Sequence, residues 1–412
     1  MTDRYEIHSM NRYTFAAIAL ACAMPTTAHA KVNLAKALEV IRAIGPEGSG
    51  NARAKEAWQA VSQVSSDQLT EVLAAMQDSQ PLSCNYLRAA VDTIVQREEA
   101  AGRALPKDAL VKFLKNTSMS PRSRRTAYEI LQRIIPDAEQ QFIPGMVNDP
   151  CLELRRDALA LLLTEANQLK KDEKKNEAIT VYGKVFRAAR DVDQINEAYD
   201  ALGELDTKVD LARHYGFITR WRIVAPFDNV ENKGFNVAYG PEEGVDLNAK
   251  FTAKESQEVE WRSHVSDDPN GIVDFNAAYK DDENPNKGQG GNYKGAIGYA
   301  YTVFHSSKDQ TVDLRVGCIN GNKVWVNGKE IFANEVYHSG MEIDQYVAKV
   351  KLKKGENSIL VKLAQNEQTE QWAQRWQFQL RICDEIGTAI LSSDRPASEQ
   401  TAARESTRGI IR

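Results

Sequence analysis

The chain has 412 residues, 42% of them apolar and 26% charged, and its formal net charge is −5 at pH 7. A chain of this length is expected to form two domains, or one domain and an array of repeats. The mildly acidic balance excludes a basic surface of the kind that binds nucleic acid or an anionic membrane. We therefore expect neither of these partners.

The first 30 residues are typical of a secretory signal peptide. Arg12 precedes the apolar run 15–22, and Ala28-His29-Ala30 has the small-x-small pattern of a cleavage site. This run is too short to cross a membrane, and no later segment approaches the roughly 18 consecutive apolar residues that a span needs. We expect cleavage after Ala30 and a periplasmic or secreted mature protein without a membrane span. Lipidation at Cys22 ranks second, because a lipobox would have leucine in place of Ala19.

Residues 31–215 show the apolar period of one helix after another. Three of these helices share a pattern in which an arginine is followed by alanine and then, one helical turn later, by isoleucine or leucine. The copies are Arg88, Ala90 and Ile94; Arg125, Ala127 and Leu131; and Arg156, Ala158 and Leu162. A proline precedes each copy, at Pro81, Pro121 and Pro150, and is expected to break the preceding helix.

This pattern resembles HEAT-like repeats, and residues 166–205 are similar to a tetratricopeptide unit. The resemblance implies that residues 31–215 stack into an α-solenoid, since such units cannot bury their apolar faces alone. A solenoid offers a concave surface to a protein partner. The alternative is an irregular helical bundle that carries the same arginines on its surface.

After about residue 217 the apolar period changes from that of helices to that of strands. About nine short strands with turn residues between them predict an antiparallel β-sandwich, or jelly roll, over residues 216–392. Two Asn-Gly pairs, Asn320-Gly321 and Asn327-Gly328, indicate hairpin turns on both sides of one strand. Residues 393–412 are polar and are expected to form a disordered tail. The predicted fold class is therefore multidomain, an N-terminal α-solenoid followed by an all-β sandwich.

Six strings in the C-terminal region occur in the order that one family shows. They are W-x-x-x-x-P-F at 221–227, V-x-W at 259–261, A-Y at 300–301, V-W-V-N-G-K at 324–329, L-K-K-G-x-N-x-I-L-V-K at 352–362 and W-x-F-x-L-R-I at 376–382. This order resembles the galactose-binding-domain-like, carbohydrate-binding β-sandwich of many secreted bacterial proteins. The resemblance implies the sandwich fold and a polysaccharide or glycoconjugate as ligand.

A sugar-binding site needs exposed aromatic rings, which stack on sugar C–H surfaces, and polar groups for the hydroxyls. Two tryptophans, Trp325 and Trp376, alternate with apolar neighbours, and Trp261 lies on the same strand face as Val259 and Val265. We therefore expect all three to pack in the interior. Trp372 lies instead in the polar loop 365–375, and with Arg375 it is the first predicted ligand contact.

Tyr337, His338 and Tyr279 lie in similar polar loops and complete the predicted ligand-binding set. The alternative is that the loop tryptophan folds back over one end of the sandwich.

Two Asp-rich loops, at 267–271 and 281–284, could supply the oxygen ligands that Ca²⁺ prefers. Neither fits the EF-hand loop, and Asp, Asn and Gly are also the ordinary residues of turns. We favour turns and expect no metal and no cofactor. Cys84, Cys151, Cys318 and Cys383 form no C-x-x-C pair, and the last two fall on opposite strand parities. Free, buried thiols are therefore expected.

No catalytic motif is present: G-x-S-x-G and the phosphate loop are both absent, and no context marks out a pair of carboxylates. We predict a non-catalytic extracytoplasmic binding protein, with the solenoid for a protein partner and the sandwich for glycan. One alternative is a protein–protein scaffold without sugar affinity. Another is a polysaccharide-degrading enzyme whose site lies at the domain junction, near His214 and Trp221.

Overall fold

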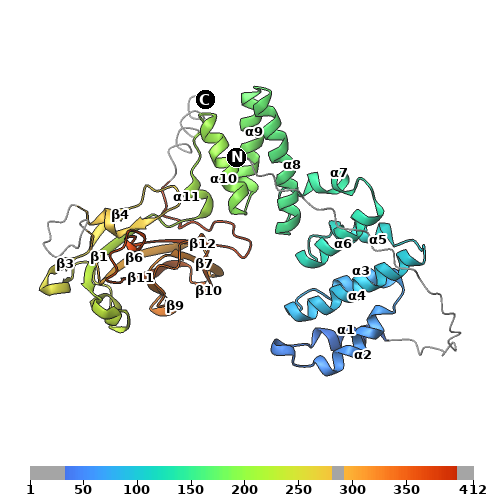
Figure 1. Cartoon of the computed structure of the whole chain (residues 1–412), viewed down its shortest axis with the longest axis horizontal. Helices are drawn as coiled ribbons and strands as arrows, with labels where there is room; N and C mark the ends of the chain where they lie inside the picture. The colour runs from blue at the N-terminus through green and yellow to red at the C-terminus, as the bar shows by residue number, and fades with distance from the viewer. Residues whose placement is uncertain (1–32, 281–291, 397–412) are drawn as a thin grey trace, which may run out of the picture. The chain divides into compact units, whose positions relative to one another are not determined.

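The computed structural model describes residues 33–280 and 292–396, which divide into two compact units between Ala109 and Leu110 (Figure 1). Helices come first and strands follow. The predicted signal peptide, the Asp-rich loop at 281–284 and the tail beyond residue 396 lie outside the described residues. None of the helices in the described part of the chain is long and apolar enough to cross a membrane.

Eleven helices precede the sheets among the described residues. They are α1 (Leu34–Arg42), α2 (Asn51–Ser62), α3 (Leu69–Ala74), α4 (Pro81–Ala100), α5 (Lys107–Lys115), α6 (Pro121–Ile134), α7 (Ala138–Phe142), α8 (Leu152–Lys171), α9 (Lys175–Ala188), α10 (Val192–Glu204) and α11 (Leu211–Tyr215). Pro81 and Pro121 are the first residues of α4 and α6, where a missing N–H costs nothing. These two prolines therefore start the helices that carry the first two copies of the sequence pattern.

In two of the three copies a second arginine, Arg124 or Arg155, precedes the arginine of the pattern, and it is the more buried of the two. Arg124 is 1% exposed, donates from Nε to the Leu114 carbonyl, and forms a two-point ion pair with Asp149 at 2.6 and 2.7 Å. Arg155 is also buried and donates to the Asp149 carbonyl. Arg124 and Arg155 thus both fix the turn before α8.

Arg125 and Arg156 each link a helix to the second helix after it. Arg125 of α6 pairs with Asp157 of α8, and Arg156 of α8 pairs with Asp193 of α10. Each pair is partly solvated and contributes about 0–1 kcal/mol. Their significance is geometric, since Arg125 and Arg156 hold the same position in the sequence pattern and each reaches the second helix along the chain.

The strands form a β-sandwich within the second unit, as the alternating sequence predicts (Figure 1). They are β1 (Arg220–Asp228), β2 (Lys250–Thr252), β3 (Glu258–Glu260), β4 (Arg262–Val265), β5 (Val273–Asp274), β6 (Ala296–Ser306), β7 (Gln310–Cys318), β8 (Gly321–Val326), β9 (Lys329–Asn334), β10 (Tyr346–Leu352), β11 (Gly355–Gln365) and β12 (Gln377–Cys383). One sheet has the order β4-β1-β6-β11-β8-β9 and the other β10-β7-β12-β5, with β2-β3 as a separate ribbon. The pairings between these strands are antiparallel.

The interior between the two large sheets is apolar and contains Trp221 and Trp376. Trp261 is buried in a second cluster, on the outer face of the six-stranded sheet, and Trp325 packs half-buried against that cluster. Trp261 and Trp376 are buried as predicted, whereas Trp325 is only half-buried on the outer face, so the interior position predicted for it is wrong. The four described cysteines are free and buried, as expected.

The two Asn-Gly pairs play different roles. Asn327 and Gly328 have φ of 51° and 78° and join β8 to β9 in the predicted hairpin turn. Asn320-Gly321 is not a hairpin, because β7 and β8 belong to different sheets and neither residue has a positive φ. This pair instead lies where the chain crosses between the sheets, and Asn320 is fully buried.

The Arg124–Asp149 pair can be tested by substitution. Replacing Arg124 with methionine leaves a buried carboxylate without its partner, so the free energy of unfolding should fall by about 3–5 kcal/mol. Urea denaturation followed by circular dichroism measures this. Arg122→Met, at an exposed position of the same helix, should change stability by no more than about 0.5 kcal/mol. Equal effects at the two positions would contradict the structural role of the pair.

Candidate functional site

Trp372 and His338 meet at one end of the sandwich. Trp372 lies in a short 3-10 turn, Gln371–Ala373, and 57% of its surface is exposed. The His338 ring stands edge-on to the indole, with ring centroids 5.1 Å apart and planes at 89°. Two predicted ligand contacts that are far apart in sequence therefore lie side by side, and more than half of the tryptophan surface is exposed.

His338 is fixed from both its backbone and its ring. Its φ of 59° is in the left-handed region, and its N–H donates to the Ile319 carbonyl at 2.8 Å. Its Nε2 lies 2.9 Å from Asn366 Oδ1. The imidazole is thus held between the tryptophan edge and an amide.

Asn366 organises the polar side of this cluster. Its Nδ2 donates to Gln368 Oε1 at 2.8 Å, its Oδ1 accepts from the Gln368 N–H, and its carbonyl accepts from the Gly295 N–H. Glu367 accepts from the Glu231 N–H at 2.8 Å. The loop after β11 therefore presents amide and carboxylate groups from a backbone that is already fixed.

The backbone beneath Trp372 and Arg375 is held by two buried amides. Asn320 Nδ2 and Gln365 Nε2 both donate to the Arg375 carbonyl, at 3.1 and 3.2 Å, and Gln365 Nε2 also donates to the Ala373 carbonyl. Asn320 Nδ2 donates in addition to Gln365 Oε1 at 3.0 Å. The Arg375 side chain itself is exposed to solvent.

Tyr337 supports the cluster from below. It is half-buried against the outer apolar cluster, and its hydroxyl accepts from Asn229 Nδ2 at 3.3 Å. Burial raises the pKa of its phenol, so the group stays protonated at neutral pH.

The prediction is wrong for Tyr279. This residue ends the short helix α13 (Phe275–Ala278) and is 1% exposed. Its ring stacks on Phe275, and the Arg262 guanidinium lies over it at 4.1 Å from the centroid. A ring covered in this way cannot present a face to a ligand. The nearby polar sequence is what suggested a loop.

The sequence interpretation missed Asn320, Gln365, Asn366 and Gln368. A signal exists for the first two, because each is a polar residue at the end of an otherwise apolar strand sequence. Their convergence on one carbonyl depends on the crossing from β7 to β8, which the sequence pattern had suggested to be a hairpin.

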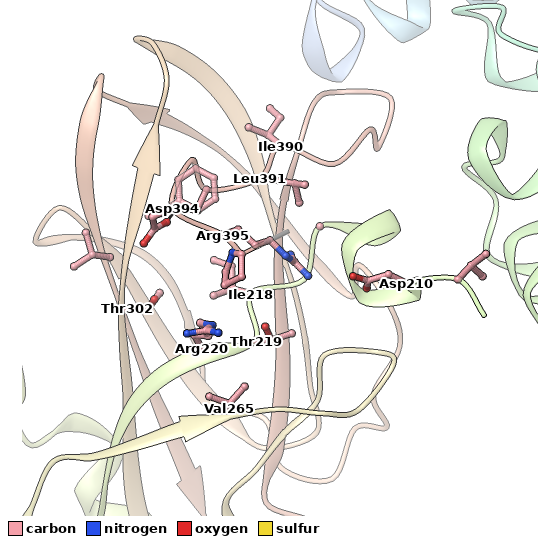
Figure 2. Close-up of a pocket in the computed structure, with 16 residues that line it drawn as sticks. Asp210, Ile218, Thr219, Arg220, Val265, Thr302, Ile390, Leu391, Asp394 and Arg395 are labelled. Atoms are coloured by element: carbon pink, nitrogen blue, oxygen red, sulfur yellow. Dashed lines mark hydrogen bonds between the residues drawn. The ribbon is translucent and has the colours of Figure 1, made fainter. Parts of the chain in front are cut away.

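A second site lies elsewhere on the same unit, in a cavity of about 430 Å³ (Figure 2). It is lined by the chain leading into α11 and β1, by the end of β6 and by residues 390–396. His214 and Trp221, named for the enzyme alternative, are not among the lining residues. His214 packs on Phe186 with ring centroids 4.5 Å apart, and Trp221 is buried against Phe378.

Within the described residues, no group of three or more His, Cys, Asp or Glu side chains is arranged to hold a metal ion. The loop at 267–271 contains two turns closed by side chains. Asp268 Oδ1 accepts from the Asn270 N–H at 2.7 Å, and Ser266 Oγ accepts from the Asp268 N–H at 3.3 Å. Turn formation is what these residues do here.

No protein-family model and no curated protein matches the chain. Among solved structures it is similar to a β-glucosidase from Kluyveromyces marxianus, with 11% identity, 27% of this chain and 12% of that one covered, and a TM-score of 0.18. It is similar to a family 35 carbohydrate-binding module from Clostridium thermocellum, with 12% identity, 20% of this chain and 69% of that one covered, and a TM-score of 0.15. It is also similar to a β-glucuronidase from Ruminococcus gnavus, with 13% identity, 40% of this chain and 28% of that one covered, and a TM-score of 0.23. Likenesses this distant show neither a family nor a ligand for this chain.

The buried amides should matter for stability. Asn320→Ala removes the acceptor of the Gln377 N–H, which is 3.1 Å from Asn320 Oδ1, and the donor to Gln365. Each buried polar group left unpaired costs about 1–3 kcal/mol, so the free energy of unfolding should fall by at least that amount. Thermal and urea unfolding measure the loss. Asn366→Ala, in the more exposed loop, should cost less; the reverse order would contradict the assigned roles.

The stability should also depend on pH through His214. Burial and, to a lesser extent, the nearby Arg190 guanidinium together lower the pKa of this imidazole to about 4. The unfolded chain takes up the proton below about pH 6.5, whereas the folded protein does not, so stability should fall as the pH drops from 6.5 toward 4. His214→Gln should make that fall shallower in urea titrations at several pH values. An unchanged slope would contradict a neutral His214 in the fold.

Proposed function

We propose that the protein is a non-catalytic, extracytoplasmic binding protein whose β-sandwich binds glycan at the Trp372–His338 cluster. The observation that carries this proposal is the exposure of Trp372. It is the only aromatic among the large hydrophobic side chains that are exposed in the described residues. An exposed indole loses the free energy that burial would supply, so its position next to fixed polar groups favours a ligand-binding role.

The chemistry of the cluster suits a sugar. The indole offers an apolar face to the C–H side of a pyranose ring, while Asn366, Gln368 and His338 offer donors and acceptors to its hydroxyls. Arg375 adds a charged donor at the rim. Because the loops are already hydrogen-bonded, binding would order few additional groups, and less conformational entropy would be lost.

The helical part is proposed to bind a protein partner as an α-solenoid. Support comes from the repeated inter-helix pairs, Arg125 with Asp157 and Arg156 with Asp193, which occur at equivalent repeat positions. Together with a glycan-binding sandwich, such a surface would tether a protein to polysaccharide outside the cytoplasm. The signal-like residues 1–30 favour that location.

Affinity electrophoresis against a panel of polysaccharides tests the glycan proposal. The wild-type protein should be retarded by at least one of them, and Trp372→Ala should weaken that binding roughly tenfold or more, because the indole supplies the central contact surface. Trp372→Phe, which keeps an aromatic face, should bind with intermediate affinity.

Val347→Ala provides the matched control, since Val347 is half-exposed on β10 and takes no part in the cluster. Its retardation should equal that of the wild type. No retardation on any gel, or the same retardation for Trp372→Ala, would overturn the site. Release of reducing sugar from the retarding polysaccharide would favour the enzyme alternative.

A further inference from the structure

The cavity in Figure 2 is separate from the Trp372 cluster. The cluster adjoins the start of β6, where Gly295 bonds to Asn366, and the cavity lies at its end, at 302–304. Along a strand this separation is roughly 23–30 Å. The cavity volume of about 430 Å³ falls within the range of small-molecule sites.

Half of the sixteen residues that line the cavity are apolar. They include Ile218, Val265, Phe304, Ile390 and Leu391. Val265 stands out because it is 59% exposed and lies on β4, the edge strand of the six-stranded sheet. Figure 2 shows Ile218 and Val265 on one side of the cavity and Ile390 and Leu391 on the other. The walls are therefore suited to the apolar body of a small ligand.

Three of the four charged side chains in the lining already have partners. Asp210 accepts from the Arg213 N–H at 2.8 Å, and Arg395 donates to the Phe217 carbonyl at 2.8 Å. Asp394 accepts from the Ser392 hydroxyl and lies 3.7 Å from His305 Nε2. These contacts hold residues 392–396 against the sandwich and use the two carboxylates of the cavity.

Arg220 is the exception. Its guanidinium forms no ion pair or side-chain hydrogen bond in the parts of the chain that the structure describes, and it lies beside Thr219 and Val265 (Figure 2). A guanidinium presents a planar set of donors that matches a carboxylate at two points. The unpaired cation at the edge of an apolar cavity therefore selects for an anionic head group.

We propose that this cavity binds a small amphiphilic carboxylate, with the carboxylate on Arg220 and the apolar body against Ile218, Val265 and Phe304. Both halves of the ligand are needed. The apolar walls alone would accept any hydrocarbon of suitable size, whereas Arg220 distinguishes an acid from an alcohol or an amine of the same length.

Isothermal titration of the full chain with three matched ligands tests this, using octanoate, octanol and octylamine. Octanoate should bind saturably, because only the acid gains a charge-assisted pair with Arg220. Octanol should bind at least roughly tenfold more weakly than octanoate, and octylamine should not bind at all. Arg220→Gln should weaken octanoate roughly tenfold or more and leave octanol unchanged. Arg220→Lys should recover part of the loss, since it restores charge without the two-point geometry.

Two controls separate this site from the rest of the molecule. Arg122→Gln removes an exposed arginine from α6, and Trp372→Ala alters the glycan cluster; neither should change octanoate binding. Val265→Asp places a negative charge at the edge of the cavity, which repels the carboxylate of the ligand, and should abolish octanoate binding. Absence of saturable octanoate binding, equal binding of octanol, or full affinity in Arg220→Gln would each overturn the proposal.

Discussion

Two buried amides, Asn320 and Gln365, connect the fold of the sandwich to its candidate site. Both are completely buried, and their side chains meet each other and the carbonyls of Ala373 and Arg375. A buried amide is stable only when its donors and acceptors are paired, so the segment that carries Trp372 must return to one place. The exposed indole is thus positioned by groups that it does not touch.

The same hydrogen bonds fix the segment in which the chain passes from one sheet to the other. Asn320 lies between β7 of one sheet and β8 of the other, and its Oδ1 accepts from the first N–H of β12. Gln365 ends β11 and accepts, through its carbonyl, from the buried Asn229. The end of the sandwich is therefore fixed by polar groups, whereas its interior is held by apolar packing.

The long strand β6 places two different chemistries at its ends. At its start are an exposed aromatic ring and loop amides, which favour a hydroxyl-rich ligand. At its end is the cavity that holds Arg220, whose guanidinium has no ion-pair partner among the described residues, and this favours an amphiphilic anion. Because β6 is paired with β11 along its whole length between them, changes at one end need not alter the other.

Local patterns in the sequence predicted what depends on local chemistry. The alternating residues gave the sandwich, Asn327-Gly328 gave the β8–β9 hairpin, and parity placed Trp376 inside. Tyr279 and the Asn320-Gly321 hairpin were predicted wrongly, because burial and sheet crossing depend on distant partners.

Trp372 and His338 could be named from the sequence, but their contact could not, and neither could the Arg220 cavity. Its walls come from four separate segments between residues 209 and 396, and no periodicity in the sequence brings these together. The burial of Arg124 and Arg155 was hidden for a similar reason, since their partners are turn carbonyls and a carboxylate that only the fold brings close.

The central claim is that a glycan covers the Trp372 indole. Of the six tryptophans in the chain, Trp372 is the most exposed, so acrylamide quenching of fluorescence should report mainly on it. An oligosaccharide from a retarding polysaccharide should protect this fluorescence in the wild type, and the protection should be absent in Trp372→Phe. An oligosaccharide that binds and leaves the quenching unchanged would contradict the claim.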